Sequence, residues 1–357
     1  MQTWQETTLE APVGLAPLQI DAVAGRRKGI FQAIVTALLV VTAAELLASM
    51  VVFGLSSHSY STDRNAHAAW FWPQYTLPRP RAADERLVIV ISNSQGDARE
   101  LKAAEAYPAM LERLLNESDR ARTYAVANWS APGIHSPEMT VLAARAAEHR
   151  PDAVLLVSFS QNFQDFGRRA PFAASKSDIG HLAYLPQVRQ HLSPWFLKRF
   201  RITSRRTWLA ARSCLLQLHE AFVGLVKGRT MRHAYLLEAR PWTKASSRQL
   251  DEFYLTFREG LPTTPLFVVN MPLNPKRFVP QTWPHVEQFD ERVHAQIGGR
   301  PGVTVLDAAT LVAPRHFLAA THLDAEGHEV FARWLLPYLK DALDANDDVM
   351  AQAAEGR

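Results

Sequence analysis

The stretch LVIVISNSQG, residues 87–96, decides the fold prediction, because an apolar run stops abruptly there at small and polar residues. Leu87 to Ile91 are apolar and mostly β-branched, which is typical of a strand buried on both faces of a sheet. Ser92 to Gly96 then predict a tight turn with Ser94 at its tip. In parallel sheets the chemistry lies at the carboxyl ends of the strands, so this serine is a candidate site residue.

Further apolar runs alternate with helical patterns along the chain. We expect strands at 122–130, 151–163, 263–272 and 302–308, and helices at 106–118, 136–150 and 324–343. Ser136 is the expected N-cap of the second helix, with Pro137 at its first helical position. This alternation predicts a three-layer α/β/α domain with a parallel sheet over residues 87–345. Residues 166–255 are expected to form a helical insertion in it, and 346–357 a C-terminal tail.

Composition sets outer limits on function. The chain has 357 residues, 47% of them hydrophobic and 21% charged, which is a globular composition. Its net charge of +4 is modest and no motif for reading DNA or RNA is present, so nucleic-acid binding is not expected. The single cysteine, Cys214, excludes disulfides within the chain and cysteine-based zinc sites. Its helical surroundings predict a buried structural thiol.

The N-terminal region predicts the compartment. Residues 1–28 end in a basic cluster, Arg26 to Lys28, and residues 29–56 are apolar and long enough to span a membrane. We expect an uncleaved transmembrane helix, a cytoplasmic N-terminus, and a catalytic domain on the periplasmic or extracytoplasmic side. A cleavable signal peptide is the alternative. Glu45 within the segment would contact a partner or lie near the interface.

Two further segments suggest contact with a membrane or partner. Residues 57–86 form a proline-rich linker whose aromatic residues 70–72 and Tyr75 would lie at the membrane surface. In the insertion, basic residues at 198–206 lie among Trp195, Phe196, Phe200 and Trp208. This mixture fits a membrane surface or an anionic partner. The alternative is a helical cap with a solvated charged face.

Four polar or small residues are expected at the carboxyl edge of the sheet. They are Ser94 after the first strand, Gly133 after the second, Asn162 after the third, and His322 after the fifth. A serine hydroxyl needs an adjacent base to become a nucleophile, and His322 is the candidate. The sequence offers no convergent metal cluster, since the spacing of His322, Asp324 and His328 does not bring them together.

In this order the residues resemble the SGNH (GDSL-like) hydrolases, with SNS, NWSAPG, SFSQNF and THLDAEGH as the matching blocks. The resemblance implies a flavodoxin-like α/β domain with Ser94 as nucleophile and His322 as base. The oxyanion hole would comprise the backbone N–H groups of Ser94 and Gly133 and the side chain of Asn162. No cofactor is implied.

The sequence departs from the family pattern at three places. Ser160 and Phe163 replace the glycine and aspartate that usually flank the third-block asparagine. Ser92 and Asn93 replace the glycine and aspartate before the nucleophile, and Ala319 stands where an aspartate usually precedes the histidine. An alanine cannot hold the imidazole. Three readings stay open: Asp307, Asp324 or a backbone carbonyl orients His322; a Ser–His dyad works alone; or the site is not catalytic.

Within the superfamily, a membrane anchor and a helical insertion resemble the envelope acyltransfer proteins of the D-alanine-transfer and alginate O-acetylation types. The resemblance implies O-acylation, expected to be acetylation, of an exported polysaccharide or other envelope glycan through an acyl-serine. A membrane-bound O-acyltransferase would be the partner. A carbohydrate esterase and a non-catalytic scaffold of an envelope complex are the alternatives.

Overall fold

The computed structural model describes residues 29–48, 75, 77, 79–98, 100–131, 133–164, 177–200, 202 and 236–355, with the side chains of 177, 178, 181 and 346–355 left aside. Residues 29–48 belong to one compact unit and the remaining described residues to a second.

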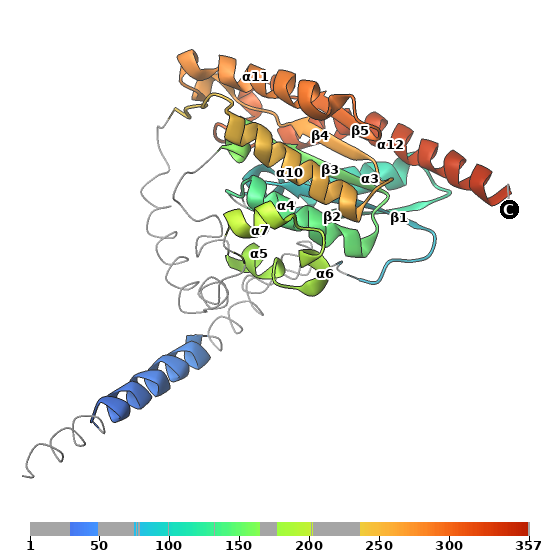
Figure 1. Cartoon of the computed structure of the whole chain (residues 1–357). Coiled ribbons are helices and arrows are strands. Elements are labelled where there is room, and N and C mark those ends of the chain that lie inside the picture. The colour runs from blue at the N-terminus through green and yellow to red at the C-terminus, as the bar shows by residue number, and fades with distance from the viewer. Residues whose placement is uncertain are drawn as a thin grey trace, which may run out of the picture. The chain divides into compact units, whose positions relative to one another are not determined.

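The second unit contains one parallel sheet of five strands, which confirms the predicted fold class (Figure 1). The strands are β1 Glu85–Ser92, β2 Thr123–Asn128, β3 Ala153–Ser158, β4 Leu266–Asn270 and β5 Val303–Asp307. Their order is β2-β1-β3-β4-β5, so β1 pairs with both β2 and β3. The chain leaves β1 in one direction and returns on its other side, which places a topological switch point between β1 and β3.

The alternation of side chains along β1 builds two hydrophobic cores, one on each face of the sheet. Leu87, Ile89 and Ile91 belong to one core, and Val88 and Val90 to the other. All five side chains are at most 1% exposed. Successive residues of a strand point to opposite faces. A continuous apolar run therefore marks a strand covered on both sides, as predicted for this segment.

Two groups of helices cover the two faces. On one face, α3 Tyr107–Ser118 packs against α12 Ala325–Glu355. On the other, α4 Ser136–Ala146 packs against α10 Lys244–Gly260, with α11 Pro284–Val293 beside β4 and β5. Short elements complete the connections: α2 Ser94–Asp97, a π-helical turn His294–Gly298, and 3-10 turns Ala103–Glu105, Ala147–His149, Ser160–Phe163, Pro275–Arg277, Pro280–Thr282 and Pro314–His316.

Part of the predicted helical insertion lies beside α4 (Figure 1). Its described helices are α5 Ser177–Leu182, α6 Pro186–Arg189 and α7 Pro194–Arg199. Val188 and Phe196 are buried in the same core as α4 and α10. α10, one of the helices that cover the sheet, begins at Lys244, which is inside the range expected for the insertion. These helices therefore belong to the domain's own packing. Cys214, Trp208 and most of the basic cluster lie outside the described residues.

Three local expectations differ from the structure. Tyr75 is 1% exposed and packs edge-on against Trp129 at 6.0 Å, so it is part of the core and does not lie at a membrane surface. α12 continues to Glu355, through most of the segment expected to be a tail. α4 begins at Ser136 with His135 as its N-cap residue, one position earlier than predicted.

The first unit contains α1, a helix over Gly29–Ala48 with a mean hydropathy of 2.1. At 1.5 Å per residue its 20 residues extend about 30 Å, the thickness of a bilayer core. Its large apolar side chains are exposed, with Phe31 at 68% and Leu39 at 65%. A membrane anchor and a signal sequence both fit this helix. Residues 49–56 of the predicted span lie outside the described residues.

Candidate active site

The turn that carries Ser94 begins directly after β1. Asn93 caps the short helix α2 by accepting a hydrogen bond from the backbone N–H of Gln95 at 3.0 Å, and Ala98 ends it in the left-handed conformation with φ of 43°. Ser94 is the first residue of this helix, and the first N–H groups of a helix have no partner inside it. The strand-to-helix turn therefore presents both the hydroxyl and the backbone N–H of Ser94 at the sheet edge.

Ser94, His322 and Glu100 form a continuous hydrogen-bonded relay. Nε2 of His322 lies 2.9 Å from Oγ of Ser94, and Nδ1 of the same ring lies 2.9 Å from a carboxylate oxygen of Glu100. With a carboxylate at Nδ1, the ring carries its proton there, and the lone pair of Nε2 faces the serine hydroxyl. This is the arrangement in which an imidazole takes the proton of an attacking serine.

Glu100 occupies the role for which Asp307 and Asp324 were the predicted candidates. Asp307 instead accepts hydrogen bonds from the Asn270 side chain at 2.9 Å and from a backbone N–H. Asp324 accepts from the backbone N–H of Gly327 at 2.8 Å, as a cap of α12. Both assignments are therefore wrong in this structure. The contact of Glu100 depends on the fold of the turn after α2, and no motif spacing in the sequence points to it.

Asn162 lies beneath the nucleophile turn, where its amide links three strand ends. Its oxygen accepts from the Phe159 backbone N–H at 3.0 Å and from the Asn93 side chain at 3.3 Å. The bond from the Phe159 N–H identifies the amide oxygen and so fixes the orientation of the amide. The amide nitrogen donates to the Ile134 carbonyl at 2.7 Å. A side-chain amide nitrogen has a second N–H. Asn162 is 3% exposed.

Gly133 follows β2 with φ of 60°, a left-handed conformation that favours glycine. The carbonyl of the next residue, Ile134, accepts a hydrogen bond from the Asn162 side chain. This bond ties the Gly133 segment to the turn after β3. Of the predicted oxyanion donors, the structure thus links Asn162 to the nucleophile turn through Asn93 and to the Gly133 segment through Ile134.

The loop after β2 supports the nucleophile turn from the other side. The Asn128 side chain donates to the Gly96 carbonyl at 2.8 Å. A Cβ added to Gly96 would lie 2.1 Å from Oγ of Ser130, so only glycine permits this approach. Side chains from two flanking segments, Asn128 at the end of β2 and Asn162 after β3, therefore hold the turn in place.

His328 takes no part in the relay. Its Nδ1 accepts the backbone N–H of Tyr107 at 3.1 Å, and its ring stacks on Tyr107. Burial lowers the pKa of His328 to about 4, so the ring is neutral at physiological pH. Within the described part of the chain, no group of three or more metal-binding side chains gathers.

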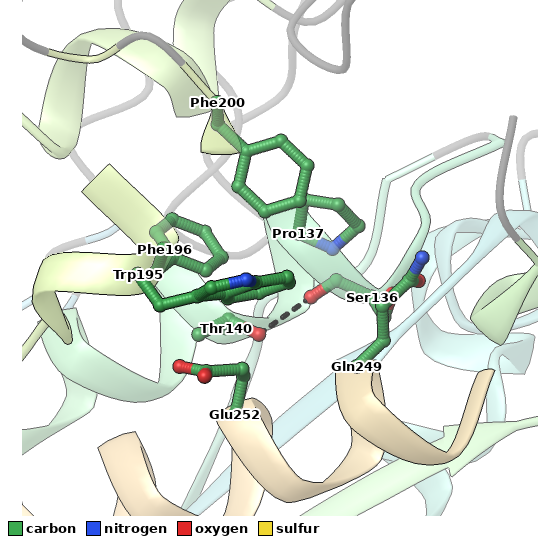
Figure 2. A pocket seen from close by; sticks show the side chains of 8 residues that line it. All are labelled: Ser136, Pro137, Thr140, Trp195, Phe196, Phe200, Gln249 and Glu252. Atoms are coloured by element: carbon green, nitrogen blue, oxygen red, sulfur yellow. Dashed lines mark hydrogen bonds between the residues drawn. The ribbon is translucent and has the colours of Figure 1, made fainter. Parts of the chain in front are cut away.

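Figure 2 shows a pocket elsewhere, between α7 and the helices α4 and α10. About 150 Å³ of space, open solvent included, lies between its lining side chains. Those side chains are Ser136, Pro137, Thr140, Trp195, Phe196, Phe200, Gln249 and Glu252. No predicted site residue is among them. Ser136 donates to Gln249, Thr140 donates to the Ser136 carbonyl at 2.7 Å, and Glu252 accepts from Ser193. The pocket therefore belongs to the packing of the insertion.

The sequence matches no protein-family model and no curated protein. Solved structures with a similar fold include a lipase from a goat rumen metagenome, at 11% identity and a TM-score of 0.39, covering 72% of this chain and 97% of that one. A GDSL-like lipase from Bacteroides ovatus has 12% identity and a TM-score of 0.40, covering 74% of this chain and 56% of that one.

A carbohydrate esterase family 2 enzyme with a carbohydrate-binding domain, from Corynascus thermopiles (Myceliophthora fergusii), is similar to the same extent. Its identity is 11% and its TM-score 0.41, covering 74% of this chain and 69% of that one. The likenesses are distant, so the chemistry rests on the side chains of this chain.

Proposed function

We propose that this chain is a serine-dependent acyl-transfer enzyme of the esterase type, which forms an acyl ester on Ser94. The single observation that carries the proposal is the relay from Ser94 Oγ through His322 to Glu100, with 2.9 Å at each contact. Each partner has the chemical type its role requires: a hydroxyl nucleophile, an imidazole base and a carboxylate.

In the first half-reaction Ser94 Oγ attacks the carbonyl carbon of an ester while its proton passes to Nε2 of His322. The carbonyl oxygen becomes an oxyanion, for which the backbone N–H groups of Ser94 and Gly133 and the second N–H of Asn162 are the donors. His322 then gives its proton to the departing alcohol, leaving acyl-Ser94. Glu100 stabilises the imidazolium between these two transfers.

In the second half-reaction an acceptor hydroxyl gives its proton to His322 and attacks the acyl group, and the proton returns to Ser94. For the acceptor, we propose a hydroxyl of an exported polysaccharide or other envelope glycan, with acetyl as the acyl group. The apolar helix α1 and the resemblance to envelope acyltransfer proteins support this choice. A membrane-bound O-acyltransferase would then supply the acyl donor at the membrane.

Water is the second candidate acceptor, and one observation favours it. The side chains of His322 and Glu100 are 28% and 46% exposed, so solvent reaches the relay. A site open to water hydrolyses its acyl-enzyme unless another hydroxyl is bound in its place. On this reading the chain is an extracytoplasmic esterase. The scaffold alternative drew its support from Ala319, and Glu100 now supplies the carboxylate that this position lacks.

The proposal is tested by detecting the covalent acyl group on Ser94. The full chain in detergent micelles would be mixed with p-nitrophenyl acetate, quenched in acid, digested and analysed by mass spectrometry. We expect one acetyl group on the peptide containing Ser94, and none in Ser94→Ala. An unmodified wild-type peptide, together with a Ser94→Ala variant that keeps full activity in cells, would overturn the enzyme and favour the scaffold.

A second measurement separates the acceptors. Acetylated chain would be mixed with an excess of a soluble polysaccharide, and both free acetate and ester-linked acetate on the polymer would be measured. Transfer predicts that polymer-bound acetate rises as free acetate falls. Release of free acetate at the same rate with and without the polymer would leave the hydrolase as the function.

A further inference from the structure

Gln95 lies between the turn that carries Ser94 and the loop that carries His322. Its side-chain nitrogen donates to the carbonyl of Pro272 at 2.9 Å and to the carbonyl of Thr321 at 3.0 Å. An amide nitrogen has two N–H groups, so both are used. The side chain is 1% exposed. This one residue therefore joins the nucleophile turn to the segment after β4 and to the histidine loop.

The loop that carries His322 is closed on itself. An antiparallel bridge pairs Phe317 with Leu323, and the backbone N–H of Leu318 donates to the His322 carbonyl at 2.8 Å. These bonds make the loop a compact turn, in which the Thr321 carbonyl and the His322 side chain have fixed relative positions. A displacement of the Thr321 carbonyl is therefore a displacement of the imidazole.

The contacts of Gln95 lie next to the reacting atoms on both sides. Gln95 follows Ser94 in the chain, and Thr321 precedes His322. The backbone N–H of Asn274 also holds the loop, through the Ala320 carbonyl at 2.9 Å, but it does not touch the nucleophile turn. Among the described side chains, Gln95 thus directly links the residue after Ser94 to the residue before His322.

The unpaired side-chain oxygen of Gln95 indicates that this glutamine does more than fill space in the core. Oε1 is buried, and within the described residues it has no donor. Burying an acceptor without a partner costs free energy, whereas an apolar side chain of similar shape would fill the same space without that cost. The two N–H groups are what glutamine adds here over methionine or leucine.

We propose that Gln95 is a positioning residue that sets the distance between Ser94 and His322 by holding the Thr321 carbonyl. The inference rests on the proposed function, since it concerns the same relay. It predicts that loss of the amide lowers the reactivity of Ser94 only where His322 is present to act as base.

The test is a double-mutant cycle read with a fluorophosphonate probe on the full chain in detergent micelles. Ser94 Oγ attacks phosphorus, a P–O bond forms as fluoride leaves, and the serine proton passes to His322. We expect Gln95→Met to label roughly tenfold to a hundredfold more slowly than wild type, because small misplacements of reacting groups are costly. In a His322→Ala background the same substitution should change labelling by less than about twofold.

The pH profile supplies a second readout that a merely structural role would not move. Gln95→Met should shift the pH dependence of labelling toward that of His322→Ala, because a displaced imidazole takes the proton of Ser94 less effectively. Gln95→Asn keeps the amide but shortens its reach by one methylene. If Gln95→Met does not fold, Gln95→Asn takes its place in the experiment and should show the same change.

Asn116 offers a matched control at the opposite edge of the sheet. Its side-chain nitrogen also bridges two backbone carbonyls, those of Glu112 at 2.8 Å and Tyr124 at 2.9 Å. Asn116→Leu should lower the melting temperature while leaving the shape of the labelling profile unchanged.

The outcomes distinguish the two proposals. Wild type that is labelled at Ser94, with Gln95→Met labelled at the same rate, overturns the positioning role and leaves the function standing. An equal slowing by Gln95→Met with and without His322 overturns it as well. Wild type that is not labelled at Ser94 overturns the function, and the role of Gln95 with it.

Discussion

Ser94 lies on a turn that almost fully buried side chains tie to its neighbours. Glu100, six residues later, lies on a turn where its side chain is 46% exposed. Asn93, Gln95 and Asn162 hold the nucleophile turn at exposures of 4%, 1% and 3%. The comparison suggests a division of labour. The bond-forming atom needs a fixed position, and burial supplies it. The carboxylate acts through charge, which tolerates solvent at a cost in strength.

The largest effect on activity is expected from removing the hydroxyl of Ser94, the reacting group on the turn held by buried side chains. Ser94→Ala should lower kcat/KM for p-nitrophenyl acetate by roughly 10⁴-fold or more, since little catalysis remains without the nucleophile. Ser118→Ala is the control, because that hydroxyl bonds the Leu115 carbonyl at the end of α3, away from the relay. Activity of Ser94→Ala within tenfold of wild type would contradict the assignment.

Asn162→Ala tests the buried support and the oxyanion donor together. We expect kcat to fall by roughly 10²- to 10³-fold, the usual cost of one oxyanion donor. KM should change little, because the donor acts mainly on the transition state. Steady-state kinetics with p-nitrophenyl acetate measure both quantities. A raised KM with an unchanged kcat would instead place Asn162 in substrate binding.

Glu100→Gln tests the exposed side and should have a smaller effect. Hydrogen bonds to charged groups contribute about 1.5–3 kcal/mol, and solvent reduces this, so we expect kcat to fall about tenfold. Salt should narrow the gap, because it screens exposed charges. Glu105→Gln is the matched control: Glu105 lies in the next turn and bonds the Lys102 backbone at 3.0 Å. Equal losses in both variants would refute the relay.

The smallest effect on activity at neutral pH is expected from His328→Asn, whose consequence is instead a change in acid stability. The buried ring has a pKa of about 4, below the ordinary 6.5, so the unfolded chain binds the proton more readily. The stability from this group is complete above about pH 6.5 and is lost as pH falls toward 4. The loss amounts to about 3 kcal/mol. Urea unfolding of wild type and variant at pH 7 and pH 4.5 should show a smaller decline in the variant.

The sequence was sufficient for the strands and for two members of the relay. The apolar run at Leu87 to Ile91 indicates a strand covered on both faces, and the parallel topology brings Ser94 and His322 to one edge. The structure then places their atoms 2.9 Å apart. Predictions from pattern worked where a residue's position follows from the end of a regular element.

Prediction failed where a contact depends on an irregular turn. Glu100 reaches His322 only because α2 ends at Ala98 in a left-handed conformation and the chain turns back, which no periodic pattern encodes. Asp307 and Asp324 are the acids that the sequence suggests for this role, but Asp307 bonds Asn270 and a backbone N–H, and Asp324 caps α12. Tyr75 was assigned by composition to a membrane surface, but its ring packs against Trp129.

The positions of the three relay residues along the chain have a consequence for synthesis. Ser94 and Glu100 leave the ribosome together, while His322 follows the nucleophile by 228 residues. On the proposed function, a nascent chain that stops before His322 holds a serine without its base, and the hydroxyl gains that base only when α12 and the loop before it fold against the sheet. On this proposal, the enzyme would therefore stay inactive until the segment that carries His322 has been synthesised and has folded.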